Sequence, residues 1–147
     1  MNVLLLSRYD YNGASSRVRY LQYLPYFNAN GCLVKVSSLF SNKYLASLYA
    51  GNSIMSHVSY GYMKRFLLLF KVHNYEVLII EKELFPFLPA WFELILNHIK
   101  IPYVVDFDDA LFHRYDLHKR WFIRGLLGRK IDTVMRNSSV VIAGNHY

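Results

Sequence analysis

Short continuous apolar runs recur along the chain, separated by longer stretches in which apolar and polar residues are mixed. A continuous apolar run of strand length is typical of a strand buried on both faces of a parallel sheet. On this pattern the sequence predicts strands at residues 3–7, 33–38, 76–80, 102–106 and 139–143.

The stretches between these runs carry apolar residues at helical spacing. A first helix is predicted to be capped by Ser15 or Ser16 and to kink or stop early at Pro25. The Asn30-Gly31 pair should end it. Further helices are predicted at residues 44–49, 62–72, 88–99 and 121–136. Strands that alternate with helices indicate βαβ units, so we expect an α/β fold with a Rossmann-like open parallel sheet and helices on both faces.

Length and composition narrow the class of protein further. With 147 residues, 54% of them hydrophobic, the chain can bury a core without a disulfide or a metal. We expect one domain over residues 1–147 that is incomplete at its C-terminal end, because little chain follows the last predicted strand to cover it. Cys32 is the single cysteine, which excludes an internal disulfide and fits a reducing, cytoplasmic compartment. No stretch predicts a membrane span.

Polar loops follow most of the predicted strands, at the edge where open parallel sheets bind ligands. Glycine lets the backbone approach a ligand, and serines at a helix N-terminus leave amides and hydroxyls for an anion. Ordinary turn or helix-cap chemistry would explain each loop without a ligand. The candidate substrate-binding residues are Gly13, Ser15, Ser16, Arg17, Glu81, Lys82, Asn145 and His146, and the candidate catalytic residues are Asp106, Asp108 and Asp109.

The aspartates form the most costly feature of the sequence, because carboxylates so close together repel one another. Residues 106–109 read Asp-Phe-Asp-Asp. Such crowding raises the pKa of some of the carboxyls or requires a cation or an arginine as partner. An Asx-turn with a helix cap is the structural alternative. The histidines show no metal-ligand spacing, so no metal site is predicted.

Positive charge is concentrated in one segment. The formal net charge is +7, and most of the excess lies between residues 113 and 136, where aromatic residues and leucines are interleaved with the basic ones. A basic helix of this kind can lie on an anionic membrane surface, with Lys119, Arg120, Trp121 and Arg124 as docking residues. A solvated basic face on a helix that packs against the sheet is the alternative. No nucleic-acid-binding module is recognisable, so no nucleic-acid partner is expected.

Taken in order, these motifs resemble the N-terminal half of a GT-B-fold glycosyltransferase of the retaining family-4 type, often described as group 1. The resemblance extends over nearly the whole chain. Its motifs are the strand at 3–7 and the segments 13–19 (GASSRVR), 23–27 (YLPYF), 81–84 (EKEL), 103–110 (YVVDFDDA) and 140–145 (VVIAGN).

The resemblance implies an acceptor-side domain that serves sugar transfer from a nucleotide-sugar to a sugar or lipid-linked acceptor, as in cell-envelope polysaccharide assembly. The loop at 13–17 would face the cleft of such an enzyme, and the aspartates of 106–109 would lie at its floor, where many members of the family carry a histidine. Their role would be to orient an acceptor hydroxyl or to hold a loop. The donor is a co-substrate rather than a cofactor, and the domain that chiefly binds it is absent here. We therefore expect a chain that is inactive alone, as an acceptor-side domain, a truncation product, or a subunit that needs a separate C-terminal-domain partner. We expect it in the cytoplasm, on the inner face of the cell membrane.

Two other functions are compatible with the sequence. Residues 104–111 resemble the first motif of haloacid-dehalogenase-like phosphatases, which would make Asp106 the nucleophile and Asp108 the acid, with magnesium. Asp109 and Ala110 stand where that motif usually has glycine and threonine. A non-catalytic, basic module that docks on membranes is the third possibility.

Overall fold

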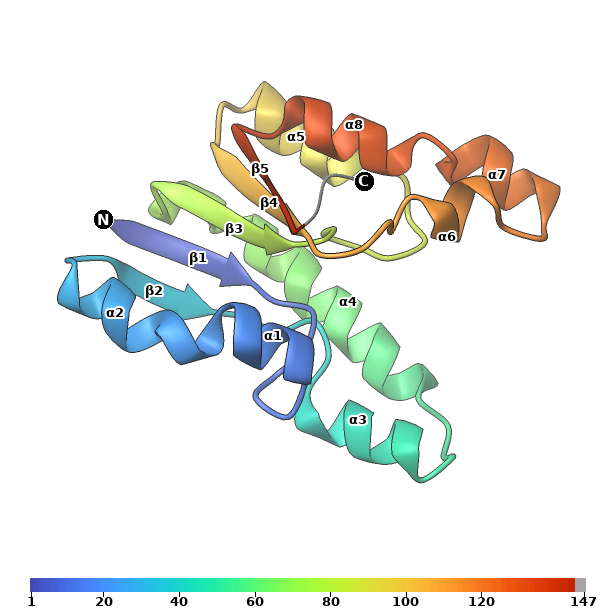
Figure 1. Ribbon diagram of the computed structural model, residues 1–147, viewed down its shortest axis with the longest axis horizontal. Helices are drawn as coiled ribbons and strands as arrows, with labels where there is room; N and C mark the ends of the chain where they lie inside the picture. Colours follow the sequence, from blue (N-terminus) through green and yellow to red (C-terminus); the bar gives the residue numbers. More distant parts are fainter. Residues whose placement is uncertain (145–147) are drawn as a thin grey trace. The chain divides into compact units, whose positions relative to one another are not determined.

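The computed structural model describes residues 1–144, which form an α/β fold (Figure 1). The strands form a five-stranded open parallel sheet in the order β2-β1-β3-β4-β5, which confirms the predicted fold class. The strands are β1 (Asn2–Leu6), β2 (Leu33–Val36), β3 (Val77–Glu81), β4 (Tyr103–Phe107) and β5 (Val140–Ala143). The helices are α1 (Ala14–Arg19), α2 (Leu24–Ala29), α3 (Asn42–Tyr49), α4 (Met55–Leu69), α5 (Trp91–His98), α6 (His113–Asp116), α7 (Trp121–Leu127) and α8 (Lys130–Asn137), with 3-10 turns η1 (Leu21–Tyr23) and η2 (Val72–Asn74).

Contacts within the chain group its residues into two compact units. Unit 1 comprises Met1–Leu78 and holds β1, β2 and the helices α1 to α4. Unit 2 begins at Ile79 and holds β4, β5 and the helices α5 to α8. A single domain over residues 1–147 stays a prediction.

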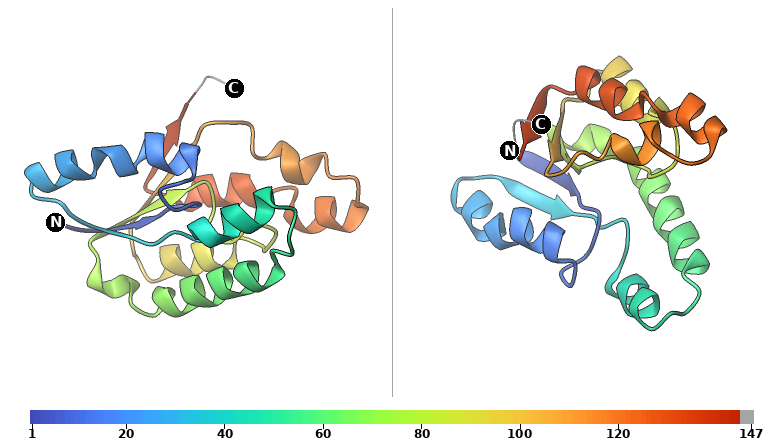
Figure 2. Two further views of the ribbon diagram at one scale, coloured as in Figure 1. Left: turned by 90° about the horizontal axis from the view of Figure 1, so that it is seen from below. Right: turned by 45° about the vertical axis from the view of Figure 1, so that its right-hand side comes forward.

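In unit 1 the strands β1 and β2 pair in parallel, with Val3 opposite Val34 and Leu5 opposite Val36. Residues 3–6 of β1 are all buried. A strand buried on both faces needs an apolar residue at every position rather than at every second one, which explains the continuous apolar run in the sequence. The helices α1 and α2 lie on one side of this pair of strands and α4 lies on the other, as right-handed connections require (Figure 2).

The prediction of the first helix is wrong about the residue that caps it and about the position where it is interrupted. Gly13, not Ser15 or Ser16, precedes the first residue of α1. A Cβ atom on Gly13 would lie 2.2 Å from Tyr9 Cβ, so the chain turns there at a distance that only glycine tolerates. The helix is interrupted at Tyr20 (φ −133°, ψ −55°), and Pro25 lies in the first turn of α2, where proline is tolerated.

Three later helices also differ from their predicted bounds. Helix α4 begins at Met55 rather than at residue 62. The prediction was late because polar and small residues in the first turns of the helix conceal its apolar pattern. Helix α5 begins at Trp91, after Pro89. The predicted helix at 121–136 is two helices, α7 and α8, separated at Gly128. A Cβ atom on Gly128 would lie 2.4 Å from the Arg124 carbonyl oxygen.

A buried arginine joins helix α4 to the ends of the two strands of unit 1. Arg65 is 1% exposed, and its Nη2 donates to the carbonyl oxygens of Ser7 at 2.5 Å and of Ser37 at 2.9 Å. These carbonyls lie just beyond the last residues of β1 and β2. Buried carbonyl groups need hydrogen-bond donors, and the planar guanidinium can serve two of them at once. Arg65 therefore fixes α4 against the carboxyl ends of both strands.

In unit 2 the strands β4 and β5 pair in parallel, with Val105 opposite Val141. Helices α5 and α8 pack side by side, and the buried face of α8 carries Ile131 and Val134. The Tyr103 hydroxyl donates to the Val134 carbonyl oxygen at 3.0 Å, which connects β4 to α8.

Replacing either of two glycines inside helices by alanine should change the free energy of unfolding, with opposite sign in the two variants. A Cβ atom on Gly61 in α4 would lie 2.2 Å from the Leu39 carbonyl oxygen, whereas a Cβ atom on Gly125 in α7 would meet nothing within 4 Å. We expect Gly61→Ala to lower the free energy of unfolding by about 1–3 kcal/mol, because backbone must move. Gly125→Ala should raise it by about 1 kcal/mol or less through higher helix propensity. Urea unfolding followed by circular dichroism measures both, and a change of the same sign in the two variants would contradict this packing.

Candidate functional site

In unit 2 a lysine follows directly after β3, with a backbone conformation that is rare for its type. Lys82 has φ +67°, in the left-handed region. Its backbone N–H donates to the Asp106 carbonyl oxygen at 3.1 Å. A non-glycine residue in this region costs roughly 1 kcal/mol or more, and such residues are concentrated at functional sites. The surrounding structure therefore holds Lys82 in place at the carboxyl end of the strand.

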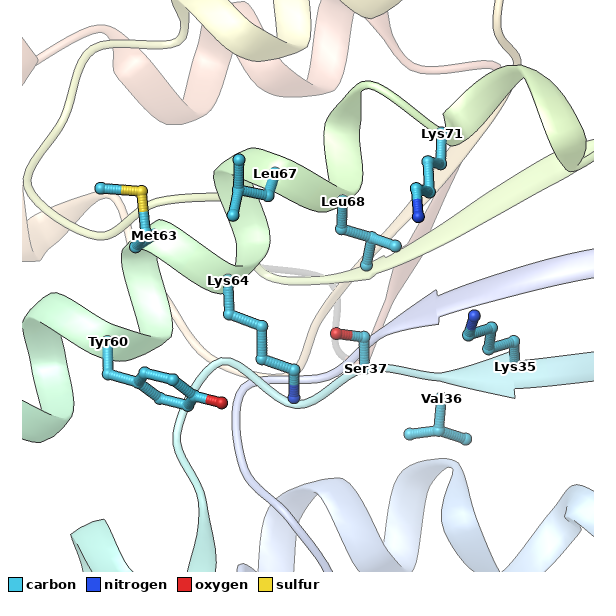
Figure 3. A pocket seen from close by; sticks show the side chains of 9 residues that line it. All are labelled: Lys35, Val36, Ser37, Tyr60, Met63, Lys64, Leu67, Leu68 and Lys71. Atoms are coloured by element: carbon cyan, nitrogen blue, oxygen red, sulfur yellow. The ribbon is translucent and has the colours of Figure 1, made fainter.

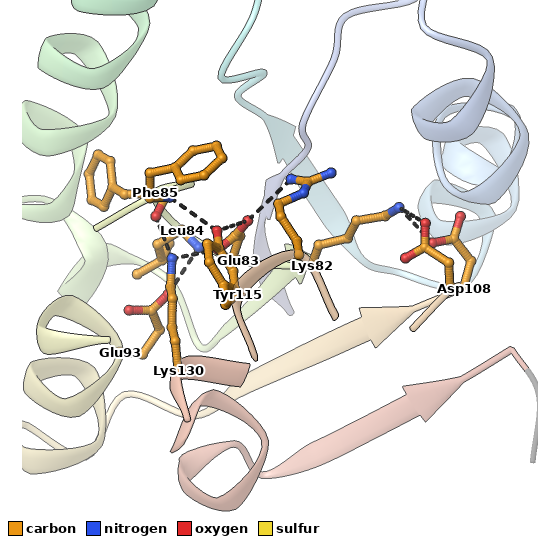
Figure 4. Close-up of polar contacts among 11 residues, drawn as sticks. Lys82, Glu83, Leu84, Phe85, Glu93, Asp108, Tyr115 and Lys130 are labelled. Atoms are coloured by element: carbon orange, nitrogen blue, oxygen red, sulfur yellow. Dashed lines mark hydrogen bonds and ion pairs between the residues drawn. The ribbon is translucent and has the colours of Figure 1, made fainter. Parts of the chain in front are cut away.

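The Lys82 side chain forms ion pairs with two of the predicted catalytic aspartates. Its Nζ lies 2.8 Å from Asp108 Oδ1 and 3.1 Å from Asp109 Oδ2, and Figure 4 shows the extended side chain reaching Asp108. The lysine is 9% exposed, whereas the Asp109 side chain is 59% exposed. The cation that the crowded carboxylates require is therefore Lys82, which follows the neighbouring strand β3. The Asp109 carboxylate still faces water.

The other two acids predicted at this edge are buried. Asp106 is 4% exposed and Glu81 is 1% exposed. The structure thus brings Lys82, Asp108 and Asp109 together in an accessible group and leaves Asp106 and Glu81 inside. Gly144, after β5, contacts the loop that carries the aspartates: its N–H donates to the Phe107 carbonyl oxygen at 2.8 Å, and a Cβ atom on it would lie 3.2 Å from Asp108 Cα.

Next to Lys82 in the chain, Glu83 forms a buried ion pair that holds the loop following β3. Glu83 is 2% exposed, and Lys130 of α8 is 3% exposed and in direct contact with Glu83 Oε2. The Tyr115 hydroxyl donates to Glu83 Oε2 at 2.7 Å, and Lys130 Nζ also donates to the Phe85 carbonyl oxygen at 2.5 Å (Figure 4). Arg114 Nη1 lies 3.8 Å from Glu83 Oε1. The carboxylate therefore has donors on both oxygens, which a buried charge requires.

A second buried carboxyl holds the same loop from the side of α5. Glu93 Oε1 accepts the Leu84 N–H at 3.0 Å. Burial raises the pKa of Glu93 above its ordinary value near 4.5, although the charge of Lys130 and the Leu84 hydrogen bond oppose that effect. Burial, and then the charge of Glu83, raise the pKa of the Tyr115 hydroxyl far above its ordinary value near 10, so Tyr115 acts as a donor at neutral pH.

The first predicted site, the loop at 13–17, lies in unit 1. Ser16 is fully buried, and its Oγ accepts the Tyr9 N–H at 3.0 Å, so it stabilises the turn. Gly13 is required by the close approach of Tyr9. Arg17 is exposed, and its Nη1 donates to the Tyr11 carbonyl oxygen at 3.3 Å. Ser15 is half-buried, which leaves Arg17 and Ser15 as the side chains here that face water.

The predicted docking residues lie at the start of α7. Trp121 is 77% exposed, and Phe122 and Leu126 on the same helix are 50% and 63% exposed. Arg124 Nη1 donates to the His118 carbonyl oxygen at 2.9 Å, so its guanidinium folds back over the turn that holds Lys119. The predicted residues Asn145 and His146 lie outside the described part of the chain.

Sequence reasoning missed Glu83, Tyr115 and Lys130 as members of one buried network. Lys130 was included in the basic surface segment, although Ile131 and Val134 show that it shares their buried face of α8. A charged residue on the apolar face of an amphipathic helix was the available signal. It could not name the partner, because Glu83 precedes Lys130 by 47 residues.

The buried pair can be tested by removing one charge and then both. Lys130→Met should lower the free energy of unfolding by about 3–5 kcal/mol, because Glu83 is left buried without its cation. Adding Glu83→Gln to that variant should restore a large part of the loss, since the glutamine can still accept from Tyr115. Lys119→Met, at an exposed lysine, is the control and should change stability by about 0.5 kcal/mol or less. Equal losses in Lys130→Met and Lys119→Met, measured by urea unfolding, would exclude a stabilising role for the pair.

Within residues 1–144, no three histidine, cysteine or acidic side chains are grouped closely enough to hold a metal ion. No helix of that part of the chain has both the length and the apolar character needed to cross a membrane. The sequence matches no protein-family model and no curated protein.

Proposed function

We propose that this chain is the acceptor-side half of a glycosyltransferase, which moves a sugar from a nucleotide-sugar to a sugar or lipid-linked acceptor. The observation that carries the proposal is the group of Lys82, Asp108 and Asp109 at the carboxyl ends of β3 and β4. Open parallel sheets bind their ligands at this edge. The resemblance of the motifs to family-4 glycosyltransferases supplies the reaction class.

The three side chains offer the chemistry that a sugar acceptor needs. Sugar hydroxyls both donate and accept hydrogen bonds, and the exposed Asp109 carboxylate can accept from one while Lys82 donates to a neighbouring oxygen. In the transfer the acceptor oxygen bonds to the anomeric carbon, the bond from that carbon to the diphosphate breaks, and the hydroxyl proton passes to a base. Asp109 is the carboxylate best exposed to receive it.

A separate domain would hold the donor in this proposal. Strand β5 supports the need for a covering partner, because Val140, Val141 and Ile142 are 52%, 40% and 47% exposed on an edge strand. Exposed apolar edge strands are a liability that proteins usually cover. A C-terminal-domain partner would bind the nucleotide-sugar and would also cover the exposed strand β5.

The phosphohydrolase alternative depends on Asp106 as a nucleophile. A nucleophile must reach the phosphorus atom of its substrate, and Asp106 is 4% exposed. The accessible carboxylate of the cluster is Asp109, which has no role in that motif. The exposure of the two acids therefore favours sugar binding over phosphate-ester hydrolysis.

The acceptor site can be tested with the chain alone. In saturation-transfer NMR with a panel of monosaccharides, we expect at least one sugar to bind and Asp109→Asn to weaken it by about tenfold, the loss of one charged hydrogen bond. Asp132→Asn, at an exposed aspartate of α8 remote in sequence from the group, should bind as the unmodified chain does. With nucleotide-sugars and lipid-linked acceptors the chain alone should show no robust turnover. Robust turnover, or sugar binding insensitive to Asp109→Asn, would refute the proposal.

The exposed aromatic face of α7 supports docking on an anionic membrane, where a lipid-linked acceptor would be met at the cytoplasmic face. Trp121 and Leu126 supply apolar area, and Lys119 and Arg120 supply charge. Each basic residue near such a surface contributes about 1 kcal/mol, so Lys119→Glu/Arg120→Glu should reduce co-sedimentation with phosphatidylglycerol vesicles at least about tenfold. Arg129→Glu reverses the charge of an exposed arginine that lies beyond α7, and it is the control. If both variants lose binding equally, α7 is not the docking face.

A further inference from the structure

A groove in unit 1 lies between the edge strand β2 and helix α4, and it is lined by three lysines. Lys35 comes from the strand, and Lys64 and Lys71 come from α4 and the turn after it. Figure 3 shows all three amines directed into the space between the two elements. The groove has a volume of about 450 Å³, within the usual range for small-molecule sites.

The positive charge in this groove has no counter-charge. Among the described residues, no acid lines the groove, and none of the three lysine side chains forms an ion pair or a side-chain hydrogen bond. A cleft lined by charges of one sign raises the local concentration of ions of the opposite sign. Lys35, Lys64 and Lys71 are therefore arranged to attract an anion.

A buried hydroxyl group adds a second, independent observation. Ser37 lines the groove, is 5% exposed, and its Oγ has no hydrogen-bond partner within the described residues. Its backbone is fixed, since its N–H donates to the Leu5 carbonyl oxygen at 2.8 Å and its carbonyl oxygen accepts from Arg65. A buried hydroxyl without a partner costs free energy, so its presence indicates a ligand acceptor that completes it.

The remaining walls of the groove are apolar. Tyr60 and Leu67 recur at helical spacing with Lys64 on one face of α4, and both are more than half exposed. An inorganic anion would leave these side chains in water. A ligand that combines an anionic head with an apolar body would use the whole groove.

We infer that this groove binds an organic phosphate, with the phosphate on Lys35, Lys64, Lys71 and the Ser37 hydroxyl and the apolar part against Tyr60 and Leu67. A phosphate monoester carries close to two negative charges and three acceptor oxygens, which matches several lysine donors and one hydroxyl. The site involves unit 1 alone, so it is independent of the sugar site proposed in unit 2.

Isothermal titration of the full chain with hexyl phosphate tests the inference. We expect one saturable site that binds hexyl phosphate more tightly than inorganic phosphate or hexanol. Lys64→Gln/Lys71→Gln should weaken binding about tenfold, and Ser37→Ala about threefold. Lys43→Gln, an exposed lysine of α3 outside the groove, is the matched control and should bind normally. Circular dichroism checks that each variant is folded.

A vesicle arm identifies the source of the phosphate. Binding to phosphatidic acid vesicles that the groove variants abolish, with no binding of hexyl phosphate, would assign the phosphate to a lipid head group and still support the groove. Binding of hexyl phosphate without vesicle binding would assign it to a soluble ligand. Absence of binding in both arms, or equal binding by the double lysine variant and Lys43→Gln, would overturn the inference.

Discussion

The buried ion pair between Lys130 and Glu83 is the interaction on which the candidate site depends. Opposite charges in a low-dielectric interior attract strongly, and removal of one partner leaves the other charge buried without compensation. Here the pair connects α8 to the loop after β3, and Tyr115 and the Phe85 carbonyl complete the donors and acceptors around it. The loop is thereby tied to α8, and Lys82, the residue before Glu83, reaches Asp108 and Asp109.

The same physical solution occurs in unit 1, where Arg65 serves the carbonyl groups that follow β1 and β2. In each unit a cation from a helix is carried into the interior and donates to polar groups just past the ends of parallel strands. Backbone groups at such positions leave the hydrogen-bonding ladder of the sheet and need other partners. A lysine or arginine carries several donors on one long side chain, so it can serve two acceptors at once and hold the loops at the carboxyl edge in place.

How far the sequence predicted the structure depended on whether the signal was local. Every strand was found, because each carries a short run of mostly apolar residues. Burial on both faces explains that run in β1, whereas the edge strands β2 and β5 carry it while partly exposed. Gly13 was missed as the start of α1, because the reason for it is the close approach of Tyr9 Cβ and not a side-chain cap. The carboxyl-edge loops were located by the topology rule, but the pairing of Lys82 with Asp109 joins residues 27 apart in sequence, and no periodicity reports such a contact. Lys130 shares the apolar face of α8, which indicates that it is buried, but its partner Glu83 is equally invisible to a local pattern.

The placement of the two tryptophans has a practical consequence for spectroscopy. Trp91 is 61% exposed and Trp121 is 77% exposed, so each indole already meets water in the folded chain. Their emission should therefore change little when the chain unfolds, while the buried tyrosines, Tyr103 and Tyr115, move into water. Intrinsic tryptophan fluorescence in this protein reports on what touches the outside of α5 and α7, and a shift of the Trp121 emission to shorter wavelength would register contact with an apolar phase directly, without an added label.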